Sequence, residues 1–478
     1  MKREIIVNKT LEESRVAVLE NGRLFDLFIE RRESKKILNN IYKGKVQNIV
    51  PALNSAFVDI GFGKNAYLDI VDVVSAQHDK DKKEVENMIK PEQDIMVQVY
   101  KEPIHSKGPK VTMDISLPGR LLVYMPFSNN IGVSRNIGEK KEYDRLKSIV
   151  VELKKNIAGG IIVRTEAEEA TKAEIKNEMT YLTRLWASIL KRFNDVKPMS
   201  LVHKDLDIVF QTVRDYFSDD VISMRIDSRK ELKDVTEFVK IVSTEFLDRL
   251  VLYDGKIPIF KAYGIEEEIK ELSSNKVKLC SGGHLIIQEA ESLCAIDVNS
   301  GNFMAESTQE STAVLTNIEA AQEIARQLRI RNIGGIIVID FIDMREASNR
   351  RKILEKLREA TKGDKARIKM WPITRLGLIE MTRERKRESL FSLLGDTCPV
   401  CHGLGLVLSK ESIFINVCYE IKQLKIDDYD GKIKIKLNPN VVEYFRERKA
   451  RLKRLFNVEF EIISGTEMLH EDYSIVFE

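Results

Sequence analysis

The first 120 residues consist mainly of short runs in which apolar and polar residues alternate. A period of two is typical of β-strands with one buried face. The runs at 4–9 and 14–30 include an Asn21-Gly22 pair, a strong signal for a tight hairpin, and we expect them to form the edge of a sheet. From 37 to 120 the runs are broken by glycine and proline, at Gly61, Gly63, Pro91 and Gly108. Short strands and turns in this rhythm predict a small barrel.

After about residue 140 the hydrophobic period changes to that of helices. The charged stretch from Glu168 to Phe193 carries apolar residues at intervals of three and four, which predicts a helix with one buried face. These residues are Ile175, Met179, Leu182 and Leu185. The apolar run GGIIVRT at 159–165 is predicted to be a strand that precedes this helix.

Residues 285–344 have the pattern of strands joined by a long helix. Strands are predicted at 285–290 and 292–299, followed by a helix from Gln309 to Arg331. The apolar run GGIIVIDFIDM at 334–344 then predicts a strand buried on both faces. Together these elements predict a βαβ unit.

Composition and length limit the class of protein. At 478 residues the chain exceeds the size of one hydrophobic core, and its end, 411–478, has the pattern of a small α+β domain with a helix from Val441 to Phe456. No stretch approaches the roughly 20 apolar residues of a membrane span, and no secretory signal is visible, so we expect a cytoplasmic protein. The formal net charge of +3 is too small to indicate a polyanionic partner, so a nucleic-acid site must be local.

Two of the predicted strands carry an aspartate at their ends, Asp297 in SLCAIDVNSGN and Asp340 in GGIIVIDFIDM. Strands joined by one helical crossover are parallel and usually adjacent, and ligands bind beyond their carboxyl ends. With Asn299 they offer hard oxygen ligands that suit Mg²⁺ and a phosphate oxygen, which indicates phosphodiester cleavage. The alternative is that each aspartate begins a turn or caps a helix. Asp343 is interpreted as a support of the pair or as such a cap.

The five cysteines are odd in number and sparse, which argues against a disulfide framework. Only Cys398 and Cys401, in CPVCHGLG, have the spacing of metal ligands. A structural zinc ion takes four ligands, so two protomers that each donate one pair would complete a site. His402 is a possible third ligand, although its adjacency to Cys401 makes good geometry difficult. Free or redox-active thiols are the alternative.

Motifs along the whole chain resemble those of the ribonuclease E/G family, especially its short, G-type members. In family order they are NIYKGKV with SAFVDIG, GGIIVRT, AIDVNSG, NIEAAQEIARQLRIRNIGGIIVIDFIDM, ITRLGLIEMTRERKRESL and CPVCHGLG. Because this sequence ends just after the predicted catalytic region, without the long scaffold tail of the E type, we expect a G-type member. The resemblance implies a Mg²⁺-dependent endoribonuclease for single-stranded, A/U-rich RNA. It further implies stimulation by a 5′-monophosphate and a role in rRNA 5′-end maturation and mRNA decay.

The resemblance also implies the fold: a multidomain α/β protein with RNase H-like and DNase I-like subdomains and an inserted S1-type OB-fold barrel. The expected divisions are an RNase H-like subdomain from 1–36 and 211–275, the S1 domain 37–120, a 5′-end sensor region 121–210, the DNase I-like subdomain 276–396, a zinc link 397–410 and a small C-terminal dimerisation domain 411–478. A homodimer would share one zinc ion, and whether two dimers pair into a tetramer is left open.

The same resemblance assigns roles to single residues. Asp297 and Asp340 would hold Mg²⁺, and Asn299 would orient them or the scissile phosphate. In the barrel, Phe57 and Tyr67 would stack on bases while Lys107 supplies charge. The 5′-terminal phosphate would be bound by Arg164 and Thr165, with help from Gly119, Val123 and Arg135, and Arg375 would lie near the RNA path. Without the resemblance, Phe57 is ordinary barrel core, and Lys107 and Arg164 are surface residues.

The competing interpretation is a non-catalytic protein that binds or scaffolds single-stranded RNA. Such a protein would use the same barrel and charged helices. The paired aspartates argue against it, because carboxylates that face a polyanion weaken binding. A zinc-dependent redox or hydrolytic enzyme is disfavoured because no open three-ligand zinc site is visible.

Overall fold

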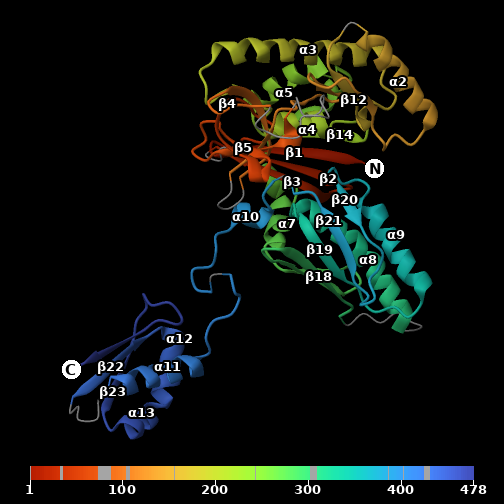
Figure 1. Cartoon of the computed structure of the whole chain (residues 1–478). Coiled ribbons are helices and arrows are strands. Elements are labelled where there is room, and N and C mark those ends of the chain that lie inside the picture. Colours follow the sequence, from red (N-terminus) through yellow and green to blue (C-terminus); the bar gives the residue numbers. More distant parts are fainter. Residues whose placement is uncertain are drawn as a thin grey trace. The chain divides into compact units, whose positions relative to one another are not determined.

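The computed structural model describes residues 2–32, 36–73, 88–103, 108–155, 157–242, 244–301, 309–385, 387–401, 403–424 and 431–478. The chain divides into two compact units, Met1–Phe391 and Ser392–Glu478, and each is described by itself. Element labels follow Figure 1. No helix in the described ranges has the length and apolar character needed to cross a bilayer.

The first sheet of the larger unit combines the N-terminus with a segment 200 residues later in the chain. Its order is β15-β14-β1-β2-β3, with β1 parallel to β14 and antiparallel to β2. The strands are β1 (Arg3–Lys9), β2 (Glu13–Glu20), β3 (Arg23–Arg31), β14 (Val221–Ile226) and β15 (Leu250–Leu252). The predicted hairpin at Asn21-Gly22 is confirmed, because both residues have positive φ between the antiparallel β2 and β3. Strands from residues 3–31 and from 221–252 therefore share one sheet.

Helices cover this first sheet and complete its core. The helical segments are α4 (Ile208–Tyr216), α5 (Arg229–Val242), the 3₁₀ helix η5 (Thr244–Arg249), α6 (Ile259–Ala262) and α7 (Ile265–Leu272). Ile5, Ile6 and Val7 of β1 are all fully buried, so the central strand is covered on both faces. Asp207 caps α4 by accepting from the N–H groups of Val209 and Phe210.

The predicted barrel is confirmed as a closed sheet of five strands. They are β4 (Ile41–Val50), β5 (Ser55–Asp59), β6 (Ala66–Asp69), β7 (Asp94–Lys101) and β8 (Lys110–Thr112). Closure follows because β4 pairs with β5 through its second half and with β7 through its first half. A sixth strand, β13 (Ser200–His203), pairs antiparallel with the first residues of β4, 41–43. Short 3₁₀ helices, η1 (Pro51–Leu53) and η2 (Ile70–Asp72), follow β4 and β6. The topology is that of an OB-like barrel.

A small sheet and two helices follow the barrel. The elements are β9 (Leu117–Pro118), β10 (Leu122–Met125), β11 (Ile131–Val133), α2 (Lys140–Lys154), β12 (Gly160–Val163), η4 (Thr165–Ala167) and α3 (Lys172–Asp195), and the sheet order is β11-β12-β10-β9. The buried face predicted for α3 is confirmed, although Leu185 is only partly buried. Its predicted start at Glu168 is wrong, because Glu169 has φ of 64° and Thr171 forms a capping box with Glu174.

The last sheet of the larger unit contains the predicted βαβ unit. Its order is β16-β17-β18-β19-β21-β20, and its elements are β16 (Lys276–Lys278), β17 (His284–Glu289), β18 (Leu293–Asn299), α8 (Gln309–Ile330), β19 (Gly335–Asp340), α9 (Ala347–Thr361), β20 (Ile368–Met370) and β21 (Ile379–Arg383). The parallel pairing of β18 with β19 is confirmed. Figure 1 shows α8 and α9 side by side on this sheet.

Only one face of this sheet is buried, which corrects the expectation of a strand buried on both faces. Ile337 and Ile339 of β19 are fully buried against α8 and α9, whereas Ile336 is 52% exposed. The apolar run is continuous in sequence, but both helices pack on the same face. The other face is left open in the described part of the chain.

The smaller unit forms a separate α+β fold, as predicted. Its elements are α11 (Lys410–Gln423), β22 (Lys432–Leu437), α12 (Pro439–Glu447), α13 (Lys449–Phe456), β23 (Glu459–Ser464) and β24 (Tyr473–Phe477), and the sheet order is β23-β22-β24. A short helix, α10 (Leu390–Leu394), lies at the division between the units. The single helix predicted from Val441 to Phe456 is wrong, because Arg448, with φ of −103° and ψ of 6°, separates α12 from α13.

Candidate functional site

The two strand-end aspartates lie directly opposite each other. Asp297 of β18 and Asp340 of β19 are register partners in the parallel ladder. Adjacent strands are about 4.8 Å apart, so the two carboxylates can reach one ion between them. Both side chains are exposed, on the face of the sheet that no described helix covers. The structure therefore brings the pair together, on an open face of the sheet.

Asn299 belongs to the same arrangement. It follows Asp297 by two residues in the strand, which places both side chains on one face. Its Nδ2 donates a hydrogen bond of 2.8 Å to Oδ2 of Asp297. The amide nitrogen fixes the orientation of the neighbouring carboxylate, and among the described residues no partner is seen for the amide oxygen of Asn299.

The charges of the pair fit a divalent cation. Burial, and repulsion from Asp297 and Asp343, raise the pKa of Asp340 above its usual value. In the described ranges neither Asp297 nor Asp340 forms an ion pair with a basic side chain. A cation would relieve this repulsion, and carboxylate and amide oxygens are the ligands that Mg²⁺ prefers. No described group of three or more His, Cys, Asp or Glu residues is gathered as a metal site, so any Mg²⁺ here would keep several waters.

A turn just before β21 lies beside Asp343. Its hydrogen bonds run from Thr374 N to Leu378 O and from Gly377 N to Thr374 O. A Cβ atom built at Gly377 would lie 3.7 Å from Oδ1 of Asp343. Arg375 is exposed in this turn, so the structure places the predicted RNA-path arginine on a loop beside the acidic residues.

The aromatic pair of the barrel points away from the barrel interior. Phe57 and Tyr67 are register partners in β5 and β6, and their ring centroids are 6.0 Å apart at 73°. Both are partly exposed, whereas their strand neighbours Ala56 and Val58 are fully buried. Neither ring is therefore barrel core. The Nζ atom of Lys110 lies 5.2 Å from the Tyr67 ring centroid. Lys107, the predicted charge at this position, lies outside the described residues.

Arg164 and its predicted partners meet at the end of β12. Its Nη1 donates to the carbonyl oxygen of Gly119 at 2.6 Å, and the hydroxyl groups of Thr165 and Ser134 lie 2.9 Å apart. Arg135 follows Ser134 and is exposed. Val123 of β10 pairs with Ile162 of β12, one strand away. Arg164, Thr165 and Gly119 thus share one corner of the sheet, with Arg135 and Val123 on adjoining segments.

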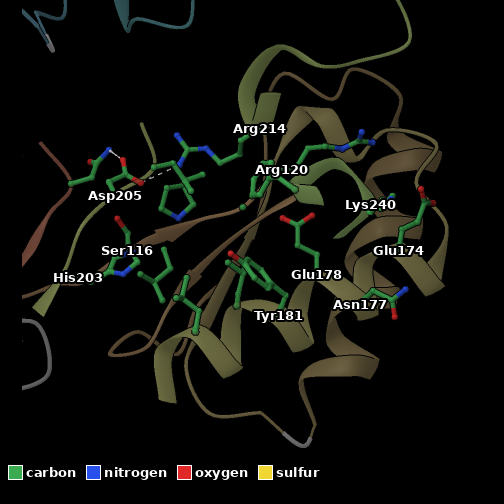
Figure 2. Close-up of a pocket in the computed structure, with 18 of the residues that line it drawn as sticks. Ser116, Arg120, Glu174, Asn177, Glu178, Tyr181, His203, Asp205, Arg214 and Lys240 are labelled. Carbon is green, nitrogen blue, oxygen red and sulfur yellow. Dashed lines mark hydrogen bonds and ion pairs between the residues drawn. The ribbon is translucent and has the colours of Figure 1, made fainter. Parts of the chain in front are cut away.

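A cavity of about 210 Å³ adjoins Gly119 (Figure 2). Its walls come from the barrel end, α3, β13 and α4, and its polar lining includes Arg120, Glu178, Tyr181, His203 and Arg214. Burial raises the pKa of Glu178 even though the N–H groups of Leu121 and Leu122 donate to its carboxylate. Arg164 itself does not line this cavity, but Gly119, which accepts from Arg164, does, and so do Asp205 and Arg214.

Gly119→Ala is expected to destabilise this region. A Cβ atom at Gly119 would lie 1.9 Å from Oε1 of Glu178, which is held by the amide of Leu121 at 2.9 Å. Moving the carboxylate would leave buried groups without partners, at a cost of about 1–3 kcal/mol. Thermal unfolding should show a lower melting temperature. Gly138→Ala is the control, because a methyl group there meets no atom within 4 Å, and equal melting temperatures for both variants would contradict the expectation.

Cys398 and Cys401 lie in the smaller unit, at the start of a glycine-rich turn. Backbone N–H groups of Cys401 and Val400, and the Cys401 thiol, lower the pKa of Cys398 and so favour a thiolate. Gly403 and Gly405 have φ of 91° and 71°, which residues with a side chain rarely adopt. His402, the possible third ligand, lies outside the described residues. Burial raises the pKa of Cys418, which makes its thiol a poorer ligand.

Comparison with known proteins agrees with the motif evidence. The model of the ribonuclease E/G family matches residues 116–386, more than half of the chain. Ribonuclease G of Haemophilus influenzae is 39% identical over 453 residues, which cover 92% of this chain and 91% of that protein. The chain belongs to the ribonuclease E/G family.

Other family members are similar over comparable lengths. Ribonuclease G of Escherichia coli strain K12 is 39% identical over 429 residues, which cover 88% of this chain and 87% of that protein. Ribonuclease E of Haemophilus influenzae is 33% identical over the whole chain but over only 52% of its own length. In the present chain, the family model covers the acidic pair and Arg164. The aromatic pair and the two cysteines lie outside the matched range.

Several charged residues around these sites were not singled out from the sequence. Lys110 was visible in the SKGPK motif, where it competes with Lys107 as the cation beside the aromatic pair. Glu178, Asp215 and Lys365 gave no local signal, because their contacts join residues 51 to 150 positions apart.

Proposed function

We propose that this protein is a Mg²⁺-dependent endoribonuclease that cleaves single-stranded, A/U-rich RNA. The enzyme class rests on family membership: the chain is an endoribonuclease of the E/G type. The observation that carries the catalytic assignment is the register pairing of Asp297 with Asp340 on an exposed sheet face. An extended RNA strand has access to such a face, whereas a closed cavity would exclude it.

Each residue of the acidic site has a distinct task in this proposal. Asp297 and Asp340 would hold the metal ion, which would stabilise developing negative charge as a Lewis acid and lower the pKa of a bound water. Asn299 would keep Asp297 in one orientation through its 2.8 Å hydrogen bond and offer its oxygen to the ion or the phosphate. Arg375 would bind RNA phosphate beside the site. The expected products carry a 5′-phosphate and a 3′-hydroxyl.

The aromatic pair and the Arg164 corner support a path for single-stranded RNA. Phe57 and Tyr67 offer ring faces for base stacking, and Lys110 adds positive charge. Arg164 and Thr165 supply a guanidinium and a hydroxyl for a terminal phosphate. Gly119, Val123 and Arg135 would complete this 5′-end sensor. We place the enzyme in rRNA 5′-end maturation and mRNA decay, as the family resemblance implies.

The decisive test of the function uses short RNAs of defined 5′ end. Purified protein is incubated with A/U-rich oligonucleotides that carry a 5′-monophosphate, a 5′-triphosphate or a 5′-hydroxyl, with Mg²⁺ and with a chelator. Cleavage that requires Mg²⁺ and is fastest on the monophosphate supports the proposal. Binding without cleavage under all conditions would instead support the RNA scaffold interpretation.

Arg164→Ala is expected to weaken the preference for 5′-monophosphorylated RNA. A charge-assisted contact contributes about 1.5–3 kcal/mol, so the preference should fall by one to two orders of magnitude. Cleavage of 5′-hydroxyl RNA should change little, because that substrate lacks the sensed group. The measurement is the ratio of kcat/KM for the two substrates. An equal loss on both substrates would show a defect in folding or in the general RNA path.

A further inference from the structure

Most of the hydrogen-bond donors of Arg164 are already used by the protein. Nη1 donates to Gly119 O at 2.6 Å and to Oδ1 of Asp215 at 2.9 Å, and Nε lies 3.3 Å from Oε2 of Glu166. A guanidinium group has five N–H donors, of which these contacts use three. Nη2 has no partner in the described part of the chain. One edge of the guanidinium is thus fixed by protein, and the Nη2 edge is left for a ligand.

Asp215 is itself held firmly. Nε and Nη2 of Arg214 contact its two carboxylate oxygens at 3.1 and 2.9 Å. Arg214 also pairs with Asp205 at 3.5 Å, and Asp205 accepts from Asn39 at 2.9 Å. Burial alone would raise the pKa of Asp215, but Arg214, Arg164 and Lys365 hold it well below its usual value. The carboxylate is therefore charged at any working pH.

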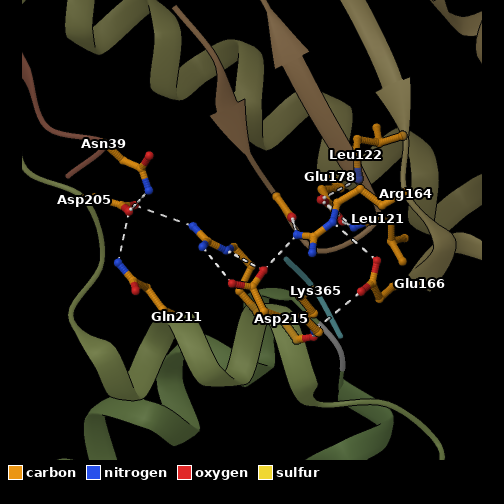
Figure 3. Close-up of polar contacts among 12 residues, drawn as sticks. Asn39, Leu121, Leu122, Arg164, Glu166, Glu178, Asp205, Gln211, Asp215 and Lys365 are labelled. Carbon is orange, nitrogen blue, oxygen red and sulfur yellow. Dashed lines mark hydrogen bonds and ion pairs between the residues drawn. The ribbon is translucent and has the colours of Figure 1, made fainter. Parts of the chain in front are cut away.

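Lys365 closes this set of contacts into a ring (Figure 3). Its Nζ donates to the backbone carbonyl of Asp215, lies 3.7 Å from Oε1 of Glu166, and sits 3.8 Å from the ring centroid of Tyr216. Lys365 lies in the loop between α9 and β20, and β20 belongs to the sheet that carries Asp340. The ring joins three separate parts of the larger unit, which limits the freedom of each member.

The charges of the ring cancel. Its cations are Arg164, Arg214 and Lys365, and its anions are Asp205, Asp215 and Glu166. The ring therefore adds no net charge that would attract the monoanionic phosphates inside an RNA chain. A terminal phosphate differs from an internal one because it carries an additional negative charge and one more free oxygen. That oxygen can accept hydrogen bonds from the fixed Nη2 group of Arg164. The acids therefore weaken binding of the wrong phosphate while they orient the donor for the right one.

We propose that Asp215 and Glu166 are positioning residues that set the specificity for a 5′-terminal phosphate. They hold the guanidinium of Arg164 with its Nη2 edge free, and they cancel the charge that would attract internal phosphates. Lys365, from the loop between α9 and β20, supports both acids. This inference rests on the proposed function, in which Arg164 binds the terminal phosphate.

The test compares kcat/KM on matched 5′-monophosphate and 5′-hydroxyl RNAs for Asp215→Asn. The ratio of kcat/KM on the monophosphate RNA to that on the hydroxyl RNA is expected to fall about three- to tenfold. Such an effect is typical of substitutions at residues coupled within one hydrogen-bond network. The hydroxyl substrate should be cleaved equally well or better. Glu166→Gln, on a partly exposed 3₁₀ helix where folding is not at risk, should give a smaller fall of the same kind. Asp219→Asn is the matched control, because it neutralises an exposed acid paired with Arg249 at 3.6 Å, away from the ring.

A double-mutant cycle separates positioning from a general structural role. In an Arg164→Ala background, Asp215→Asn should change the substrate ratio no further, because there is no guanidinium left to orient. Two outcomes would overturn this inference and leave the proposed function intact. One is an equal loss of kcat/KM on both substrates for Asp215→Asn. The other is an unchanged substrate ratio for both Asp215→Asn and Glu166→Gln while Arg164→Ala abolishes the preference. If Arg164→Ala itself leaves the preference intact, the proposed 5′-end function fails first.

Discussion

Asp297→Asn and Asp340→Asn are each expected to abolish RNA cleavage while RNA binding persists. Each change removes one of two carboxylates that lie opposite each other in the β18–β19 ladder, and it preserves the size of the side chain. Loss of one preorganised electrostatic contact to a transition state typically costs about 10²–10³ in rate, and loss of the metal ion itself costs more. Binding should be equal or slightly tighter, because a negative charge facing the RNA has been removed.

The measurements are single-turnover cleavage at saturating Mg²⁺ and binding of the same RNA in the presence of a chelator. Glu380→Gln is the matched control, because Glu380 is an exposed acid on the neighbouring strand β21 and pairs with Val338, not with Asp340. It should cleave at nearly the rate of the unmodified protein. Near-normal turnover of either aspartate variant would remove the catalytic assignment.

The acidic pair could be predicted because its signal is local. An apolar strand that ends in aspartate occurs twice, at Asp297 and Asp340, with one helix between. Chain connectivity then makes the strands parallel neighbours, and the ladder confirms this. The OB-like barrel and the hairpin at Asn21-Gly22 were also predictable, since turn residues and a period of two define them within a few positions.

The open face of the sheet that carries the acidic pair could not be predicted in the same way. The run GGIIVI before Asp340 is apolar throughout, which is the pattern of burial on both faces. Which face is covered depends on where α8 and α9 pack, and both pack on the side of Ile337 and Ile339. The exposure of the two aspartates is thus a property of tertiary packing.

The ring around Arg164 is the clearest case of information that is absent from local sequence. Asp215 is 51 positions from Arg164, and Lys365 is 150 positions from Asp215. Each residue alone is an ordinary charge on a helix or loop. Their pairing depends on how three segments meet in the fold. The periodicities of helices and strands relate only residues a few positions apart, so they cannot predict contacts over such separations.

Replacing both Cys398 and Cys401 with serine is expected to remove zinc and convert a dimer into monomers. One chain supplies two thiolates, and a closed tetrahedral site requires four ligands, so unmodified protein should bind about half an equivalent of zinc per chain. The cysteine-to-serine double variant should bind none. Sedimentation and metal analysis of the same sample test both expectations. Activity on long RNA should fall with the dimer if the sensed 5′ end and the scissile bond are bound by different protomers.

The outcome distinguishes a shared site from an intramolecular one. Cys418→Ser is the control, because its thiol, partly buried on α11 with a raised pKa, is not expected to bind the metal. That variant should keep both zinc and the dimer. One full equivalent of zinc per chain in the unmodified protein, with an unchanged dimer in the cysteine-to-serine double variant, would contradict the shared site. The metal would then need further ligands from the same chain, with His402 adjacent in sequence as the first to replace, and the dimer contact would have to lie on another surface.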